Sequence, residues 1–136
     1  MAVADKVSHA PWLAELAGEL IAMLDFPANW NSYGAPQISP CALGYVLAVV
    51  HETMDAHSIK PIALPSPSGG VQLEWHQRGV DFEVEVLPSG ELSMYFGIRV
   101  KGEENRNEHE LELEGPLEDL AAPIREHIQK YLTTYN

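Results

Sequence analysis

The chain has 136 residues, enough for one hydrophobic core but too few for two, so we expect a single domain over residues 1–136. Hydrophobic residues make up 46% of the sequence and charged residues 21%, which is typical of a folded protein and excludes a disordered chain. Eight basic residues against twenty acidic ones give a formal net charge of −12. This charge disfavours binding to nucleic acid or to an anionic membrane and favours a basic protein partner.

The negative charge is concentrated in the second half of the chain. Residues 1–68 hold two bases and six acids, for a net charge of −4, whereas residues 69–136 hold six bases and fourteen acids, for −8. A well-solvated surface would account for the same numbers. The charge alone therefore leaves two interpretations open, namely simple solubility and a docking surface for a basic partner.

Cysteine content and hydrophobicity exclude several classes of protein. The single cysteine, Cys41, rules out an intramolecular disulfide and a four-cysteine zinc site. Residues 1–9 contain no apolar run suited to a signal peptide, and the longest apolar stretch, residues 45–50, is far too short to span a membrane. We therefore expect a cytoplasmic protein, or a phage product that acts in the cytoplasm.

The first half of the sequence predicts two helices separated by a loop. Residues 10–25 carry apolar side chains at helical spacing, with an expected inward face of Leu13, Leu16, Leu20, Met23 and Leu24. Residues 26–38 are rich in turn residues. Ser39 and Pro40 then suit the N-cap and first position of a second helix, which should end near residue 56. Its expected inward face is Leu43, Val46, Leu47, Val50 and Met54.

The second half predicts a sheet and a last helix. Prolines and glycines disfavour a helix over residues 58–69, which we interpret as an extended crossing from the helices to the sheet. Apolar and polar residues then alternate with the period of a half-buried strand, which predicts strands over residues 71–76, 82–86, 92–100 and 109–114. A final helix starts at Gly115-Pro116 and either kinks or begins at Pro123.

These elements predict an α+β fold made of two N-terminal helices, a four-stranded antiparallel meander and a C-terminal helix. The helices should cover one sheet face and leave the other open and acidic. The residues expected to point into the core are Val71, Leu73, Trp75, Phe82, Val84, Val86, Leu92, Met94, Phe96 and Ile98.

The polar positions of the predicted strands form the first candidate site. If the strands pair in order, the open face collects Glu74, Asp81, Glu83, Glu85, Glu110 and Glu112, with His76, Tyr95 and Arg99 among them. Such a face could be merely solvated, could bind a basic partner, or could hold a metal or share a proton in catalysis.

The loop over residues 29–35 forms the second candidate site. Trp30 and Tyr33 are large rings flanked by amides and a hydroxyl, a combination that suits recognition of a ligand or peptide. We favour the other interpretation, in which the loop is an ordered part of the fold that buries both rings over the helix–sheet seam, close to residues 69–75. If the loop binds a ligand or peptide, Glu74 and Trp75 would complete the binding site.

No catalytic or cofactor motif is present. None of the six histidines has a second histidine or a cysteine at metal-ligand spacing, so we expect no cofactor and no structural metal. Gly69-Gly70 precedes a strand rather than a helix and lacks the lysine of a phosphate-binding loop. Cys41 is interpreted as a packed small residue rather than a nucleophile.

Two stretches of the sequence resemble motifs of a known family. Residues 29–35 with Ser39-Pro40 resemble the pattern NWDSYGA…SP, and residues 65–75 resemble PTPDGGVQLEW. Together they are similar to a family of small uncharacterised bacterial proteins. The resemblance implies a bacterial or phage setting but supplies no activity. The sequence departs from these patterns at Asn31 and Ser68, where aspartate is expected.

We therefore expect a non-enzymatic interaction domain that binds a basic partner, as an antitoxin, an inhibitor or a nucleic-acid mimic does. The alternative is a small enzyme or ligand-binding domain that uses the Trp30–Tyr33 loop with Glu74 and Trp75. The sequence leaves the oligomeric state open.

Overall fold

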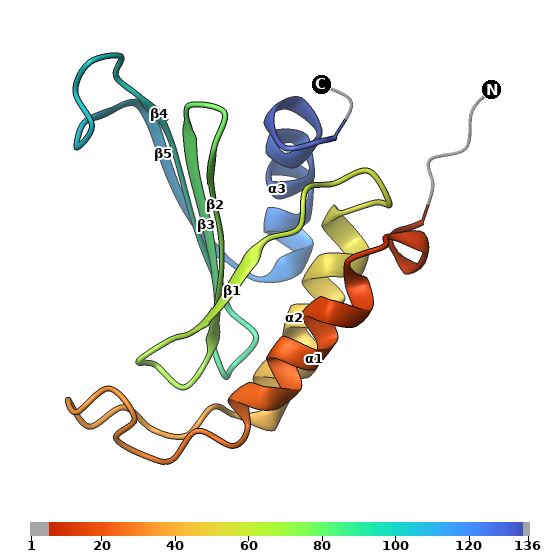
Figure 1. Cartoon of the computed structure of the whole chain (residues 1–136), viewed down its shortest axis with the longest axis vertical. Helices are drawn as coiled ribbons and strands as arrows, with labels where there is room; N and C mark the ends of the chain where they lie inside the picture. The colour runs from red at the N-terminus through yellow and green to blue at the C-terminus, as the bar shows by residue number, and fades with distance from the viewer. Residues whose placement is uncertain (1–5, 135–136) are drawn as a thin grey trace.

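A sheet of five antiparallel strands carries all the helices on one of its faces in the computed structural model, which describes residues 6–134 (Figure 1). The helical elements are η1 (Val7–His9, a 3-10 helix), α1 (Leu13–Met23), α2 (Pro40–Thr53) and α3 (Leu117–Tyr131). The strands are β1 (Ile62–Pro65), β2 (Val71–Gln77), β3 (Val80–Val86), β4 (Leu92–Arg99) and β5 (Asn107–Gly115). They lie in the sheet in sequence order, so the α+β class and the meander are confirmed.

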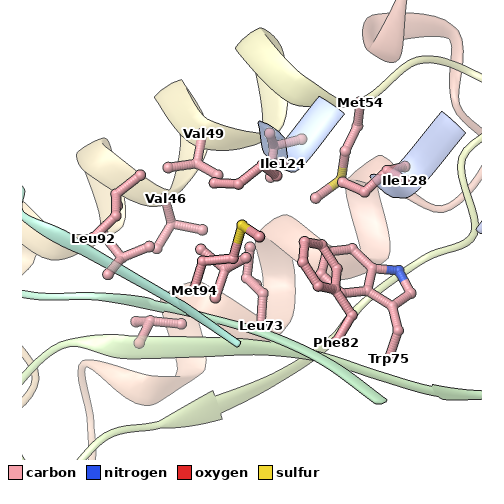
Figure 2. Close-up of a cluster of buried hydrophobic side chains, with 14 of the residues drawn as sticks. Val46, Val49, Met54, Leu73, Trp75, Phe82, Leu92, Met94, Ile124 and Ile128 are labelled. Carbon is pink, nitrogen blue, oxygen red and sulfur yellow. The ribbon is translucent and has the colours of Figure 1, made fainter. Parts of the chain in front are cut away.

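The core lies between the sheet and the helices. Figure 2 shows Val46 and Val49 of α2 facing Leu73 of β2, with Ile124 of α3 beside them. Trp75 is 1% exposed, and its indole Nε1 donates a hydrogen bond to the carbonyl oxygen of Ile59 at 2.8 Å. Burying this large ring with its one donor satisfied favours the folded state.

The register of the sheet follows the alternation seen in the sequence. Leu73 of β2 lies opposite Val84 of β3, which lies opposite Met94 of β4, and all three are buried. Of the ten residues expected to point into the core, nine are buried and Ile98 is half-buried against it. The predicted inward face of the sheet is therefore confirmed.

The prediction of four strands was wrong, because the extended crossing contains a fifth. Residues 62–65 pair with β2, with Ala63 opposite Leu73. Pro61 and Pro65 sit at the two ends of this short strand. Proline cannot donate to a neighbouring strand, so a strand bounded by prolines belongs at the edge of a sheet, where β1 lies.

The helix boundaries and faces also needed correction. Leu47 is 38% exposed, whereas Val49 and Thr53 are buried, so the inward face of α2 is rotated from the predicted one. Leu24 follows the end of α1 and is 37% exposed. The last helix begins at Leu117 and continues through Pro123 rather than starting there. Among the helices within residues 6–134, none is long and apolar enough to cross a membrane.

Candidate functional site on the open face of the sheet

The outward side chains of the central strands form a polar surface, called the open face below, on the side away from the helices. It consists of Gln72, Glu74, His76, Asp81, Glu83, Glu85, Ser93, Tyr95, Arg99, Asn107, Glu110, Glu112 and Glu114. Each lies one residue away from an inward neighbour because successive strand residues point to opposite faces. Strand alternation therefore gathers on one surface carboxylates that are far apart in the sequence.

The centre of the open face is a group of four residues, which form two successive outward-facing pairs of β2 and β3. Glu74 lies directly opposite Glu83, and His76 lies directly opposite Asp81. His76 Nδ1 is 2.7 Å from an Asp81 carboxylate oxygen, while His76 Nε2 is 3.3 Å from Glu74 Oε2 and 3.9 Å from Glu83 Oε1. The imidazole thus sits between three carboxylates.

Two further residues fix this group in place. Arg99 donates a hydrogen bond to Asp81 Oδ1 at 2.7 Å, and Gln72 donates one to Glu74 Oε1 at 2.9 Å. Arg99 bonds the same Asp81 oxygen that His76 Nδ1 contacts, whereas Gln72 bonds the Glu74 oxygen that His76 does not contact. The other oxygen of Glu74 and one oxygen of Glu83 both lie near His76 Nε2.

The three carboxylates of this group lie close together, and this proximity shifts the pKa values of its members. Burial and the nearby Glu74 carboxylate raise the pKa of Glu83 above its ordinary value. The hydrogen bond with Asp81, helped by Glu74, raises the pKa of His76 against the opposing effect of burial. For Asp81, burial acts to raise the pKa, but hydrogen bonds from His76, Arg99 and Asn107 outweigh it and leave the pKa lowered. The negative charge of Glu83 is therefore less well balanced by hydrogen-bond donors than that of Asp81.

A second polar group lies where β4 meets β5. Asn107 donates a hydrogen bond to the Tyr95 hydroxyl oxygen at 2.8 Å, and that hydroxyl donates to Glu110 at 2.9 Å. A Cβ on Gly97 would lie 2.6 Å from the same hydroxyl oxygen, so glycine is what lets the Tyr95 ring lie across the strand. The register shifts opposite this point, and His109 has a φ of 53°, as expected of a β-bulge.

Glu85 has a structural role that its position on the open face does not reveal. Its carboxylate accepts hydrogen bonds from the hydroxyls of Ser66 and Ser68, in the turn between β1 and β2. These bonds tie the edge hairpin to β3. An aspartate at position 68 would place a second carboxylate beside Glu85, whereas Ser68 supplies a donor.

The predicted site residues fall into separate parts of the molecule. The open face carries Glu74, Glu83, Glu85, Glu110 and Glu112, as the alternation indicated. Trp75 points to the opposite side and is buried in the core, so it cannot join Glu74 in a surface site. Sequence reasoning missed Gln72, Asn107 and the two serines, because the bonds they make cannot be inferred from one-dimensional spacing.

The aromatic loop is ordered by its own hydrogen bonds. The Asn29 side-chain oxygen accepts a bond from the Gly34 amide at 2.6 Å, and that of Asn31 accepts bonds from the amides of Tyr33 and Ala35. An aspartate at position 31 could accept the same bonds. Tyr33 is nevertheless 91% exposed and Trp30 is only half-buried, so the expectation that the core covers both rings was wrong.

The chain reaches the start of the sheet at residues 36–39, which follow the aromatic loop. The Ser39 amide donates a hydrogen bond to the carbonyl oxygen of Gly69 at 2.9 Å, and a Cβ on Gly69 would lie 3.1 Å from the Pro36 ring. The expected proximity to residues 69–75 was assigned to the Trp30–Tyr33 loop, whereas these contacts with Gly69 come from residues 36–39. Trp30 packs instead against Phe26, with ring centroids 6.2 Å apart.

A hollow of about 420 Å³ lies elsewhere, between η1, the end of α2 and α3. Arg125 crosses it and donates hydrogen bonds to the carbonyl oxygen of Glu52 near the C-terminus of α2. Lys6, His51 and Asp55 also line it. A cation at a helix C-terminus satisfies the last carbonyls, which accounts for this arrangement as a cap of α2.

Comparison with known proteins found no matching family model, curated protein or solved structure. The chemistry of the open face therefore carries the functional argument. Its half-buried carboxylates and its imidazole can attract a cationic group and can hold a proton.

Proposed function

We propose that the protein is a non-enzymatic interaction domain that binds a basic partner protein on the open face of its sheet. An antitoxin, an inhibitor and a nucleic-acid mimic all act in this way. The observation that carries the proposal is that α1, α2 and α3 lie on one face of the sheet (Figure 1). The register places carboxylates of β2, β3 and β5 on the opposite face.

The distribution of ion pairs along the open face supports this proposal. Glu112 and Glu114 of β5 are exposed, and among residues 6–134 neither makes an ion pair. Lysine or arginine side chains of a partner could therefore reach them without displacing an internal contact. Such complementary charges accelerate association and select against acidic partners.

Apolar side chains at the other edge of the same face add a second kind of contact. Ile62 lies opposite Glu74 and is 53% exposed, and Leu64 lies opposite Gln72 and is 42% exposed. Interfaces commonly combine an apolar area with polar and charged surroundings. The face thus offers apolar area on β1 and negatively charged side chains on β2, β3 and β5.

Charge reversal on the open face tests the proposal. The variant Glu110→Lys/Glu112→Lys/Glu114→Lys should lose the basic proteins that immobilised wild-type protein retains from a bacterial extract. The control Glu52→Lys/Glu118→Lys/Glu126→Lys, which carries the same charge change on the helices, should keep them. Retention should fall steeply between 0.1 and 0.5 M salt because ions screen the attraction. Equal retention by both variants would contradict a role for this face.

The aromatic loop supports a second candidate, a ligand- or peptide-binding site centred on Tyr33. Its specific support is that a ring 91% exposed is held on a loop whose backbone is fixed by Asn29 and Asn31. Exposed aromatic rings on preordered loops bind at little conformational cost. Under this candidate, Tyr33→Ala abolishes partner retention and the charge-reversal variant does not.

A further inference from the structure

Glu74 and Glu83 form an unusual pair. They lie directly opposite each other at the centre of the sheet, with side chains only 16% and 34% exposed. Like charges at such a cross-strand position destabilise a sheet. Within the described part of the chain, the only basic side chain that pairs with either is that of His76, which is charged only when protonated, since Arg99 bonds to Asp81 instead.

The atoms that converge here are suited to metal binding. One atom each from Glu74, His76 and Glu83 lies within 4.8 Å of the other two. A zinc ion bound tetrahedrally by nitrogen and oxygen at about 2.0–2.2 Å has its ligand atoms about 3.4 Å apart. The distances from His76 Nε2, 3.3 Å to Glu74 and 3.9 Å to Glu83, therefore need only small side-chain adjustments.

The surroundings orient these groups as in a metal centre. Asp81 holds Nδ1 of His76 and leaves Nε2 directed at the two glutamates, and Arg99 holds Asp81 in turn. A carboxylate on the far nitrogen of the imidazole is the usual support of a metal-binding histidine. Gln72 occupies one oxygen of Glu74 and so favours binding through the other oxygen.

We propose that Glu74, His76 and Glu83 form a binding site for a divalent ion of the zinc type, with Asp81 as the residue that positions the imidazole. The imidazole favours zinc over magnesium or calcium, which prefer oxygen ligands alone. Three protein ligands leave the fourth position of a tetrahedral ion open to water. This inference does not rest on the proposed partner.

Calorimetric titration of the untagged protein with zinc chloride at pH 7.5 tests the site. We expect one ion per chain, an affinity at least tenfold lower in His76→Gln and in Glu83→Gln, and about 10- to 100-fold lower in Asp81→Asn. Glu112→Gln removes the same charge as Glu83→Gln from the same face, and His109→Gln removes an exposed imidazole. Both controls should bind as the wild type does.

Nuclear magnetic resonance of the imidazoles provides an independent readout that does not depend on heat of binding. Zinc should shift the Nε2 resonance of His76 and leave that of His109 in place. No binding at millimolar zinc would overturn the proposal. An equal loss of zinc affinity in Glu112→Gln and Glu83→Gln would also overturn it, because it would indicate diffuse attraction by the negative face. The same holds if calcium and zinc bind with equal affinity and His76→Gln leaves that affinity unchanged.

Discussion

Replacing Glu83 with glutamine should stabilise the metal-free protein at pH 7. The carboxylate atoms of Glu83 and Glu74 lie within 4.8 Å of each other. Two unit charges at that separation repel by about 0.9 kcal/mol at the dielectric constant of water and about 3.5 kcal/mol at an effective value of 20. Glu83 is about one-third exposed, so solvent screening favours the lower figure, and His76 offsets part of it.

We therefore expect Glu83→Gln to raise the free energy of unfolding by about 0.5–1 kcal/mol, or the melting temperature by about 2–4 °C. The pKa of Glu83 is raised above 4.5 in the folded protein, so its destabilising effect is present at neutral pH. It disappears as the pH falls through the folded pKa. The advantage of Glu83→Gln should accordingly be nearly absent at pH 4.

Urea unfolding followed by circular dichroism, at pH 7 and pH 4 with a chelator present, measures both values. Glu104→Gln is the matched control, because it removes one negative charge from an exposed loop and should change stability by less than about 0.5 kcal/mol. The reasoning is refuted if Glu83→Gln destabilises the protein at pH 7, or if its gain is undiminished at pH 4.

Four further predictions concern the fold outside the metal-binding group. Gly70→Ala should destabilise by at least about 3 kcal/mol in urea unfolding, because its Cβ would meet the Val86 carbonyl oxygen at 2.0 Å. Gly18→Ala, in open space on α1, should instead stabilise by up to about 1 kcal/mol. Tyr33→Ala should leave the melting temperature within about 1 °C of wild type, since the ring is 91% exposed, and a larger fall would mean that it packs. Lys60→Met should cost less than about 1 kcal/mol although Lys60 bonds Glu15 and Glu19, and the loss should shrink in high salt.

The strand alternation made the sheet predictable, whereas proline obscured its edge. Each residue from Val71 to Met94 that alternation assigned to the core is buried, because a strand buried on one face tolerates no shift by one residue. β1 escaped prediction because this four-residue strand follows Pro61 and ends in Pro65. The face of α2 was misplaced because nearly every side of that helix is apolar, so its pattern does not single out Val49 over Leu47.

The composition of the open face was predictable, but its internal connections were not. A two-residue turn at Arg78-Gly79, one residue shorter than the sequence indicated, places Glu74 opposite Glu83 and His76 opposite Asp81. A search for metal ligands that is limited to pairs of histidine and cysteine nevertheless misses the group of Glu74, His76 and Glu83. The hydrogen bonds from the turn serines to Glu85 join residues 17 and 19 positions apart, and only the folded hairpin brings them together.

Carbodiimide cross-linking tests the central claim most directly, because the reagent joins a carboxylate only to a lysine already in contact with it. Treating the protein in a cell extract and mapping the products by mass spectrometry identifies the glutamates that face a basic partner. We predict cross-links from partner lysines to Glu110, Glu112 and Glu114 of the open face. Cross-links concentrated on Glu52, Glu118 and Glu126 of the helices, or spread evenly over all exposed carboxylates, would contradict the account.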